Sequence, residues 1–363
     1  MKIINLIQKP QLRGAEIFAC QLSNHLLELG HEVIVVSIFK GDSQLPFKGK
    51  IINLERSLSR RFYDLRGWKK FSEILNDFNP DIVQANAADT LKFAVSSKII
   101  FSWEHILIYR NANKMGDFIL SKFKWYLNNF YLTKVDYVIS VSKECEKDFI
   151  KTFSYNTNKI VTVEIGVENQ NLGQVPLDLV PIFEKGPTLV HIGGFVPEKN
   201  HKGLIDIFNE ISKTTPEVQL LLLGKGKLEQ NIKEKVEQLG HTKNVHFLGY
   251  RTDVMNILHN ADAFILPSLI EGLPAVILEA MFCETAVIAY NVGGIGEIVV
   301  SNSTGWLVNK NDEDSMVSNI TVVLNNKREV KTSVTRAKEM ILDKFLNEKI
   351  AERFLEIYKK CVI

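Results

Sequence analysis

Short apolar segments alternate with amphipathic helical segments along nearly the whole chain, and this order leaves few folds open. In the first half we expect strands at Lys2–Ile7, Glu32–Phe39, Asp81–Gln84, Ile106–Tyr109 and Tyr137–Val141. The helical patterns of this half are Ala15–Leu29, Trp68–Phe78 and Phe118–Leu132. Apolar strands joined by helices predict a parallel sheet that is covered on both faces.

The same pattern begins again after residue 187. Its expected strands are Thr188–Ile192, Gln219–Leu223, Val245–Leu248, Ala263–Leu266 and Ala286–Ala289. Between the two series lies an aperiodic stretch with two prolines before Pro187. We therefore predict an α/β fold with two Rossmann-like domains, at residues 1–170 and 188–363, joined by a linker at 171–187.

The composition fits a globular protein and excludes other classes. Hydrophobic residues make up 45% of the chain and charged residues 24%, enough for buried cores. The net charge of +2, without a long basic run, argues against nucleic acid as a partner. The four cysteines have no paired spacing, so we expect neither a disulfide framework nor a zinc site. Nothing resembles a signal peptide or a spanning helix, so we expect a cytoplasmic protein, peripheral at most to the inner face of the cell membrane.

One segment of the first half is rich in positive charge. Its basic residues, opposed only by Glu55 and Asp64, are Lys48, Lys50, Arg56, Arg60, Arg61, Arg66, Lys69 and Lys70. Aromatic residues are interleaved with them. Two interpretations stay open: a solvated face, or a surface that rests on anionic lipid or holds a phosphorylated acceptor.

Ligands of open parallel sheets bind beyond the carboxyl ends of the strands. In the first half this rule selects the segment Arg13–Glu16 and the residues Asn86, Arg110, Asn111, Ser142 and Lys143. His105 lies at the opposite end of its strand, so we assign it no catalytic role.

In the second half the same rule selects two loops that suit a phosphate. Gly193–Asn200 combines paired glycines, which let the backbone come close to a ligand, with the cation Lys199. Pro267–Ala280 carries Glu271 in a loop, and Pro274 at the expected start of a helix whose free N–H groups form an anion site. Glu279 lies more than one turn further and can accept hydrogen bonds from sugar or ribose hydroxyls. The alternative is a capped surface helix with two solvated acids.

Motifs of several competing chemistries are missing. No Gly-x-Gly-x-x-Gly follows the first strand, and Gly224–Glu229 breaks that pattern at its last glycine, which argues against a nicotinamide enzyme. The sequence also lacks a phosphate-binding P-loop, a nucleophile elbow and a paired-His metal motif. We expect no cofactor and no metal.

Taken together, the motifs resemble the retaining family-four (group 1) glycosyltransferases of GT-B fold. The resemblance rests on the Glu-x7-Glu element at Glu271 and Glu279 and on blocks that follow in the family's order: Arg13–Glu16, Pro197–Asn200, Leu248–Val254 and Gly293–Glu297. It covers nearly the whole chain and is strongest in the C-terminal half. It implies two domains that face each other across a cleft, with the last helix, Glu348–Lys360, returning to the N-terminal domain.

The resemblance also implies a role for each domain. In the C-terminal domain, Lys199 would neutralise the diphosphate of a nucleotide sugar, while Glu271 would bind its sugar and Glu279 its ribose. The complete donor site would be Gly14, Gly193, Gly194, Lys199, Tyr250, Arg251, Glu271, Gly272, Leu273, Pro274, Ala275 and Glu279. The backbone near Tyr250 and Arg251 would contact the base, and Gly14 would close on the diphosphate from the other domain. The acceptor side would comprise Arg13, Asn86, Arg110 and Asn111, and the catalytic residues would be Glu271, Lys199 and Arg110.

The chain departs from the family's pattern at some positions. Gly194 stands where the family often has an arginine as second phosphate ligand. Asn86 and the Arg110–Asn111 pair stand where it often has histidines at the carboxyl ends of two strands. We expect Arg13 or Arg110 to supply the missing positive charge.

We therefore expect transfer of a hexose or N-acetylhexosamine from a UDP- or GDP-sugar, with retention and without a metal. The expected acceptor is a glycan or a lipid-linked saccharide in the synthesis of a bacterial surface polysaccharide such as lipopolysaccharide. A sugar-nucleotide epimerase or hydrolase of similar fold is one alternative, and a non-catalytic sugar-binding protein is another. Release of UDP only in the presence of an acceptor would separate transfer from the first alternative. Saturable sugar binding without a nucleotide would indicate the second.

Overall fold

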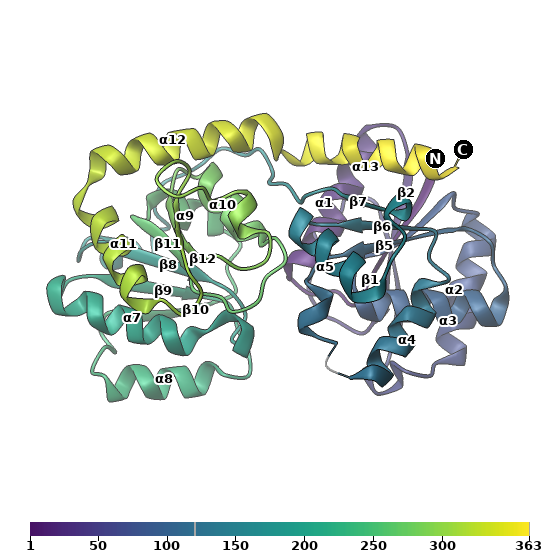
Figure 1. Ribbon diagram of the computed structural model, residues 1–363, viewed down its shortest axis with the longest axis horizontal. Helices are drawn as coiled ribbons and strands as arrows, with labels where there is room; N and C mark the ends of the chain where they lie inside the picture. The colour runs from purple at the N-terminus through teal and green to yellow at the C-terminus, as the bar shows by residue number, and fades with distance from the viewer. Residues whose placement is uncertain (120, 363) are drawn as a thin grey trace. The chain divides into compact units, whose positions relative to one another are not determined.

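The protein consists of two compact units, and the chain enters the first of them twice. The computed structural model describes residues 1–119 and 121–362. The first unit comprises Met1–Glu168 and Leu346–Ile363, and the second comprises Asn169–Phe345 (Figure 1). The predicted linker at 171–187 belongs to the second unit and contains a short helix, α6 (Val180–Phe183).

The first unit is built on a parallel sheet of seven strands in the order β3-β2-β1-β4-β5-β6-β7. The strands are β1 (Lys2–Ile7), β2 (Glu32–Phe39), β3 (Lys50–Arg56), β4 (Ile82–Ala85), β5 (Ile106–Asn111), β6 (Tyr137–Ser140) and β7 (Ile160–Thr162). Its longer helices are α1 (Gly14–Glu28), α2 (Leu65–Phe78), α3 (Ala88–Phe101), α4 (Lys122–Leu132), α5 (Lys143–Phe153) and α13 (Asn347–Val362). The expected helix Phe118–Leu132 begins later, at Lys122, and one of its residues, Leu120, lies outside the described residues.

The second unit repeats this architecture with six parallel strands in the order β10-β9-β8-β11-β12-β13. The strands are β8 (Thr188–Ile192), β9 (Gln219–Leu223), β10 (Val245–Gly249), β11 (Ala263–Leu266), β12 (Ala286–Tyr290) and β13 (Trp306–Val308). Its longer helices are α7 (His201–Thr214), α8 (Glu229–Gln238), α9 (Val254–Asn260), α10 (Ala275–Phe282), α11 (Glu313–Asn325) and α12 (Lys327–Lys344).

Alternation of side chains along the strands explains where the cores lie. In the first sheet, Leu6, Val83 and Leu107 point to one face and join Phe71 of α2 and Phe149 of α5 in a buried cluster. Ile7 and Val35 lie in a smaller cluster with Ala19 and Cys20 of α1. Because the central strands bury both faces, their sequences are almost continuously apolar.

Helix α13 belongs to the first unit, where it packs against α1. The rings of Phe18 and Phe354 lie 5.7 Å apart, and the hydroxyl of Tyr358 donates to Oε1 of Gln84 at 2.7 Å. The last helix is therefore joined to the first sheet by aromatic packing and by a buried hydrogen bond.

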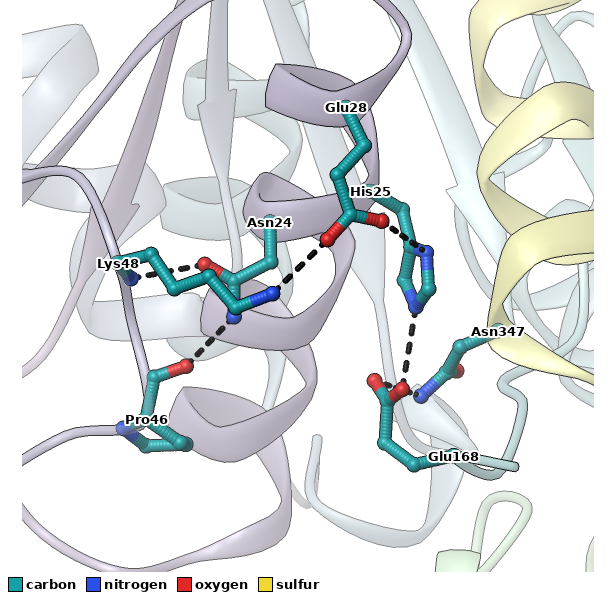
Figure 2. Close-up of polar contacts among 7 residues, drawn as sticks. All are labelled: Asn24, His25, Glu28, Pro46, Lys48, Glu168 and Asn347. Carbon is teal, nitrogen blue, oxygen red and sulfur yellow. Dashed lines mark hydrogen bonds and ion pairs between the residues drawn. The ribbon is translucent and has the colours of Figure 1, made fainter. Parts of the chain in front are cut away.

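The two places where the chain leaves and re-enters the first unit are bonded to each other. Val167 and Leu346 form a parallel bridge. The carboxylate of Glu168 accepts a hydrogen bond from Nδ2 of Asn347 at 2.8 Å and lies 3.1 Å from Nε2 of His25 on α1 (Figure 2). We call His25, Glu168 and Asn347 the crossing cluster.

No helix among residues 1–119 and 121–362 is long and apolar enough to cross a membrane.

Candidate functional site

The carboxyl edge of the second sheet has a topological switch point between β8 and β11. From β8 the chain continues to β9 and β10 on one side, whereas β11 and β12 lie on the other. Loops that leave the two strands at a switch point diverge, and the space between them is where open α/β sheets bind ligands. The two loops here are Gly193–Asn200 and Pro267–Pro274, which carry the predicted residues Lys199 and Glu271.

Lys199 and Glu271, 72 residues apart in sequence, are in direct contact. Nζ of Lys199 lies 2.5 Å from Oε1 of Glu271, and their side chains are only 20% and 10% exposed. The backbones of the two loops are also bonded, because the N–H of Leu269 donates to the carbonyl of Glu198 at 2.7 Å. The fold thus positions a cation and a carboxylate as one unit at the switch point.

Glycines allow the neighbouring loops to come this close. Gly293 has φ +58°, and a Cβ there would lie 2.1 Å from the carbonyl oxygen of Glu271. The N–H of Gly294 donates to the carbonyl of Gly272 at 2.6 Å. A side chain at Gly293 would clash with the backbone of Glu271, so the loop after β12 can pack this closely against the Glu271 loop only with glycine at this position.

Helix α10 begins behind the Glu271 loop. Pro274 occupies the N-cap position with φ −77° and ψ 123°, so the helix starts at Ala275, one residue later than we expected. No side chain in the part of the chain that the structure describes caps this end. The first-turn N–H groups therefore remain available for an anion.

Glu279 lies on α10 and is half-buried. Within the described residues its carboxylate makes neither a hydrogen bond nor an ion pair, and burial raises its pKa to about 7. A hydrogen-bond donor that binds the ionised form of such a carboxyl group stabilises its negative charge. Ribose or sugar hydroxyls are donors of this kind.

The loop after β10 is held by ion pairs. The guanidinium of Arg251 contacts Asp253 at 2.5 Å and Asp178 at 2.6 Å, and these contacts raise its pKa. Tyr250 beside it is 51% exposed. Because the side chain of Arg251 is engaged on both sides, a base could be contacted there by the loop backbone and by Tyr250. That role remains a prediction.

A buried histidine pair beneath the Lys199 loop escaped the sequence analysis. The rings of His191 and His201 lie 4.7 Å apart, and His201 stacks on Phe195 at 4.1 Å. Burial lowers the pKa of His191 to about 4 and that of His201 to about 2, so both are neutral near pH 7. They support the loop without adding charge. Their positions, one inside a strand and one at the start of α7, read as ordinary core positions in the sequence.

The predicted residues of the first unit lie in different surroundings. Asn86 is buried, and its Nδ2 donates to Oδ1 of Asn5 at 3.1 Å while its Oδ1 accepts from Gln84 at 2.9 Å. Arg110 and Asn111 are inside β5 rather than after it, because the strand continues past Tyr109. This corrects the expected loop position.

Arg110 is almost fully buried. Its Cζ lies 4.1 Å from the centre of the Phe18 ring, and Nε and Nη1 have no hydrogen-bond partner among the residues that the structure describes. Burial lowers its pKa to about 10. Arg13 instead occupies the exposed N-cap position of α1, next to Gly14.

The structure therefore brings the predicted donor residues Gly193, Lys199, Glu271 and Gly272 together in the second unit, whereas Arg110 contacts the Phe18 ring inside the first unit. No group of three His, Cys, Asp or Glu side chains in the described part of the chain could hold a metal ion.

Comparisons with known proteins identify the two domains of the chain. The model described as Glycosyltransferase Family 4 matches residues 12–171, and that described as Glycosyl transferases group 1 matches residues 180–340.

Curated relatives match over most of their length. N-acetyl-alpha-D-glucosaminyl L-malate synthase of Bacillus anthracis is 26% identical over 368 residues, covering 96% of this chain and 94% of that protein. An N,N'-diacetylbacillosaminyl-diphospho-undecaprenol alpha-1,3-N-acetylgalactosaminyltransferase of Campylobacter jejuni is 24% identical over 88% of this chain and 87% of its own.

Among solved structures, HepE of Anabaena in complex with UDP and glucose has a TM-score of 0.84 at 18% identity, covering 99% of this chain and 100% of that one. This likeness and the parallel sheets confirm the predicted fold of two Rossmann-like α/β domains of GT-B type.

Proposed function

The chain belongs to the group 1 glycosyltransferases, with a family-four domain followed by a group 1 domain, and from this premise we propose the reaction that it catalyses. It transfers a hexose or N-acetylhexosamine from a nucleoside-diphosphate sugar to a glycan or lipid-linked acceptor, with retention of anomeric configuration. The observation that carries this proposal is the Lys199–Glu271 contact at the switch point of the second sheet.

The contact gives each partner a role that changes when the donor binds. Without a donor, Lys199 and Glu271 neutralise each other. A diphosphate attracts the ammonium group of Lys199 more strongly than one carboxylate does, because it carries more negative charge. Glu271 is then released to accept hydrogen bonds from hydroxyls of the donor sugar.

The chemical barrier is the separation of charge as the sugar leaves. The bond between the anomeric carbon and the diphosphate oxygen breaks, and a bond from that carbon to an acceptor oxygen forms on the same face. The acceptor's hydroxyl proton passes to the departing diphosphate. Lys199 and the N–H groups of Ala275 and its neighbours stabilise the negative charge that develops there. Glu279 holds the ribose, and the backbone at Tyr250 contacts the base.

The donor and acceptor classes are supported by the relatives. HepE was solved with UDP and glucose, and the Campylobacter relative is named for a diphospho-undecaprenol acceptor. We propose a UDP-sugar donor, with a GDP-sugar as the second choice, and a saccharide acceptor of bacterial surface polysaccharide synthesis.

On the acceptor side we keep Arg13, Asn86, Arg110 and Asn111 as proposed residues. Arg110 is the strongest of them, because a buried guanidinium without partners is costly unless a ligand compensates it. The amide of Asn86 already bonds within the fold, so its part is to position β4.

A donor screen tests the function directly. We expect UDP- or GDP-sugars to raise the melting temperature, and the nucleoside diphosphate to be released only when a saccharide acceptor is added. Turnover should continue in EDTA, since we propose that no divalent metal takes part. Stabilisation by a free sugar but by none of the nucleotides would contradict the proposal.

A further inference from the structure

Helix α4 presents an aromatic stripe to solvent. Phe123, Tyr126 and Phe130 are 75%, 66% and 51% exposed, and their spacing places them on one face of the helix. The opposite side is attached to the fold, where Nε1 of Trp125 donates to the carbonyl of Thr152 at 2.6 Å. Large rings exposed in a row are uncommon on a soluble protein and indicate an interaction surface.

Positive charge surrounds the stripe. Lys122, Lys124 and Lys134 are exposed, and their ammonium groups form no ion pair within the described residues. The sequence from Phe118 to Lys134 contains no acidic residue. A partner of this face must therefore be apolar and negatively charged.

A second cluster of the same kind follows β3. Phe62 and Tyr63 are 68% and 70% exposed, and Cζ of Arg61 lies 4.5 Å from the centre of the Phe62 ring. Arg60 and Arg66 are exposed nearby. Fewer basic residues of the predicted segment are available to a partner than its sequence suggests, because Arg56 is paired with Asp64, and Lys48 with Glu28.

Both clusters are associated with helices that cover one face of the first sheet. The Arg60–Tyr63 cluster directly precedes α2, and the aromatic stripe is on α4, whose Trp125 packs against the same buried cluster as Phe71 of α2. Helix α3 packs against both α2 and α4, so the three helices are neighbours, as Figure 1 shows.

We propose that the aromatic stripe of α4 and the Arg60–Tyr63 cluster dock this unit on an anionic lipid bilayer. Aromatic rings with lysines beside them suit the interface between headgroups and acyl chains, where the rings are buried and the ammonium groups meet lipid phosphates. A second copy of the chain is disfavoured because like charges would face each other. Docking would bring this unit close to acceptors held in the membrane.

Strong membrane binding requires both the aromatic rings and the basic residues. Each basic residue near an anionic surface adds about a fivefold gain in partition, and a single weak anchor gives only marginal binding. Rings and charges together should give binding that needs anionic lipid and weakens in salt.

The test is cosedimentation of the full chain with vesicles, in the absence of donor and acceptor. We expect binding to vesicles of equal phosphatidylglycerol and phosphatidylcholine, and at least tenfold weaker binding to phosphatidylcholine alone. Phe123→Ser with Tyr126→Ser, or Lys122→Glu with Lys124→Glu, should each reduce the partition about tenfold or more. Arg60→Glu with Arg61→Glu should do the same.

Control variants carry substitutions of the same kinds outside the two clusters. Leu177→Ser removes a side chain that is 91% exposed, and Lys331→Glu with Arg336→Glu reverses exposed charges on α12; both should bind as the wild type does. Melting curves verify that each variant is folded.

The proposal is overturned if the wild type binds neither vesicle, if it binds both equally, or if the control variants lose as much binding as the variants of the two clusters. Concentration-dependent dimerisation abolished by the α4 variants would assign the face to a second copy instead. Because no sugar is present, these outcomes do not depend on the proposed transfer.

Discussion

The carboxyl edges of the two sheets have the same topology but use their polar side chains differently. At the second edge, Lys199 and Glu271 pair only with each other, and the carboxylate of Glu279 has no partner among the described residues. At the first edge, Asn86 bonds with Asn5 and Gln84, and Gln84 is bonded in turn by Tyr358. The first unit thus uses its polar groups to hold its own elements together.

The difference shows that strand topology determines which residues lie at the carboxyl edge of a sheet. It does not determine whether their side chains are free to bind a ligand. In the first unit the returning helix α13 supplies a partner for the polar centre of the sheet. In the second unit glycines, rather than a packed helix, line the neighbouring loops. Arg110 is the exception, since it is buried at the first edge and its Nε and Nη1 have no hydrogen-bond partner in the described part of the chain.

The largest effect that would distinguish the edges is expected for Glu271→Gln. The variant keeps size and shape but removes the charge that we assign to the donor sugar. We expect kcat to fall about 100- to 1000-fold, as for loss of one preorganised polar contact in a transition state, while affinity for UDP or GDP stays nearly constant. A melting curve controls for folding. Normal kcat with a large loss of stability would make Glu271 a structural group, and the comparison would fail.

Lys199→Ala should weaken binding of the nucleoside diphosphate about 10- to 150-fold, the worth of a charge-assisted hydrogen bond. Binding of the bare nucleoside should not change, because the lysine acts on phosphate. Lys202→Ala, at an exposed position on α7, is the matched control. Calorimetric titration measures all of these affinities. Equal losses for nucleoside and diphosphate would refute the assignment.

Sequence reasoning located the second edge better than the first. Strands β1, β2, β8, β9 and β11 have the expected bounds because they are short, apolar runs that end at turn residues. The sequence analysis missed β3, β7 and β13. The first mixes Lys50, Asn53 and Glu55 into its run because it is an edge strand, and the other two have only three residues each.

The sequence gives only part of the geometry of the candidate site. Spacing along one loop and helix is visible in the sequence, so Glu271 and Glu279 could be singled out as candidates, and their roles stay predictions. The partner of a side chain depends on tertiary packing, so neither the Lys199–Glu271 contact nor the burial of Arg110 against Phe18 could be foreseen. The aromatic stripe of α4 was missed because its rings resemble core residues until their exposure is known.

Arg110→Met tests whether the first edge has a ligand-binding group after all. Methionine can still pack on Phe18 but removes a buried charge whose Nε and Nη1 lack a hydrogen-bond partner within residues 1–119 and 121–362. We expect the free energy of unfolding to stay constant or to rise by about 1 kcal/mol, while kcat/KM falls at least about tenfold. Urea denaturation and steady-state kinetics measure the two quantities. Full activity would leave the first edge purely structural.

Glu279→Gln should weaken nucleotide binding by about five- to tenfold, which is less than the full value of a hydrogen bond to a charged acceptor because the amide oxygen of Gln still accepts. In the wild type, affinity should also fall as the pH drops below about 7, because donors bind the ionised carboxylate whose free pKa burial raises to about 7. Loss of the fold does not explain such a fall, since a raised carboxyl pKa favours the folded state at low pH. The Gln variant should lack the part of the pH dependence that comes from Glu279. An unchanged profile would show that Glu279 does not contact the ligand.

The smallest effect concerns the crossing cluster, where we expect charges of the first unit to act on stability alone. The bond to Glu168 raises the pKa of His25. Burial alone would raise the pKa of Glu168, but hydrogen bonds from His25 and Asn347 outweigh it and lower that pKa. The stability from His25 is complete below its ordinary pKa of 6.5 and is lost as the pH rises through the raised value.

The stability from Glu168 has the opposite dependence, so the cluster has its greatest effect in a limited pH window. It is complete above the ordinary pKa of 4.5 and is lost as the pH falls through the lowered value. The free energy of unfolding should therefore gain most from this pair between those two values, by at most about 1 kcal/mol for a partly exposed pair. His25→Gln should flatten this part of the profile, measured by urea denaturation, and leave nucleotide affinity unchanged. His105→Gln is the control of opposite sign, because burial lowers the pKa of His105 and its neutral form stabilises the fold as the pH rises. If His25→Gln instead changed nucleotide affinity and left the stability profile intact, the charges of the first unit would serve ligands as those of the second do.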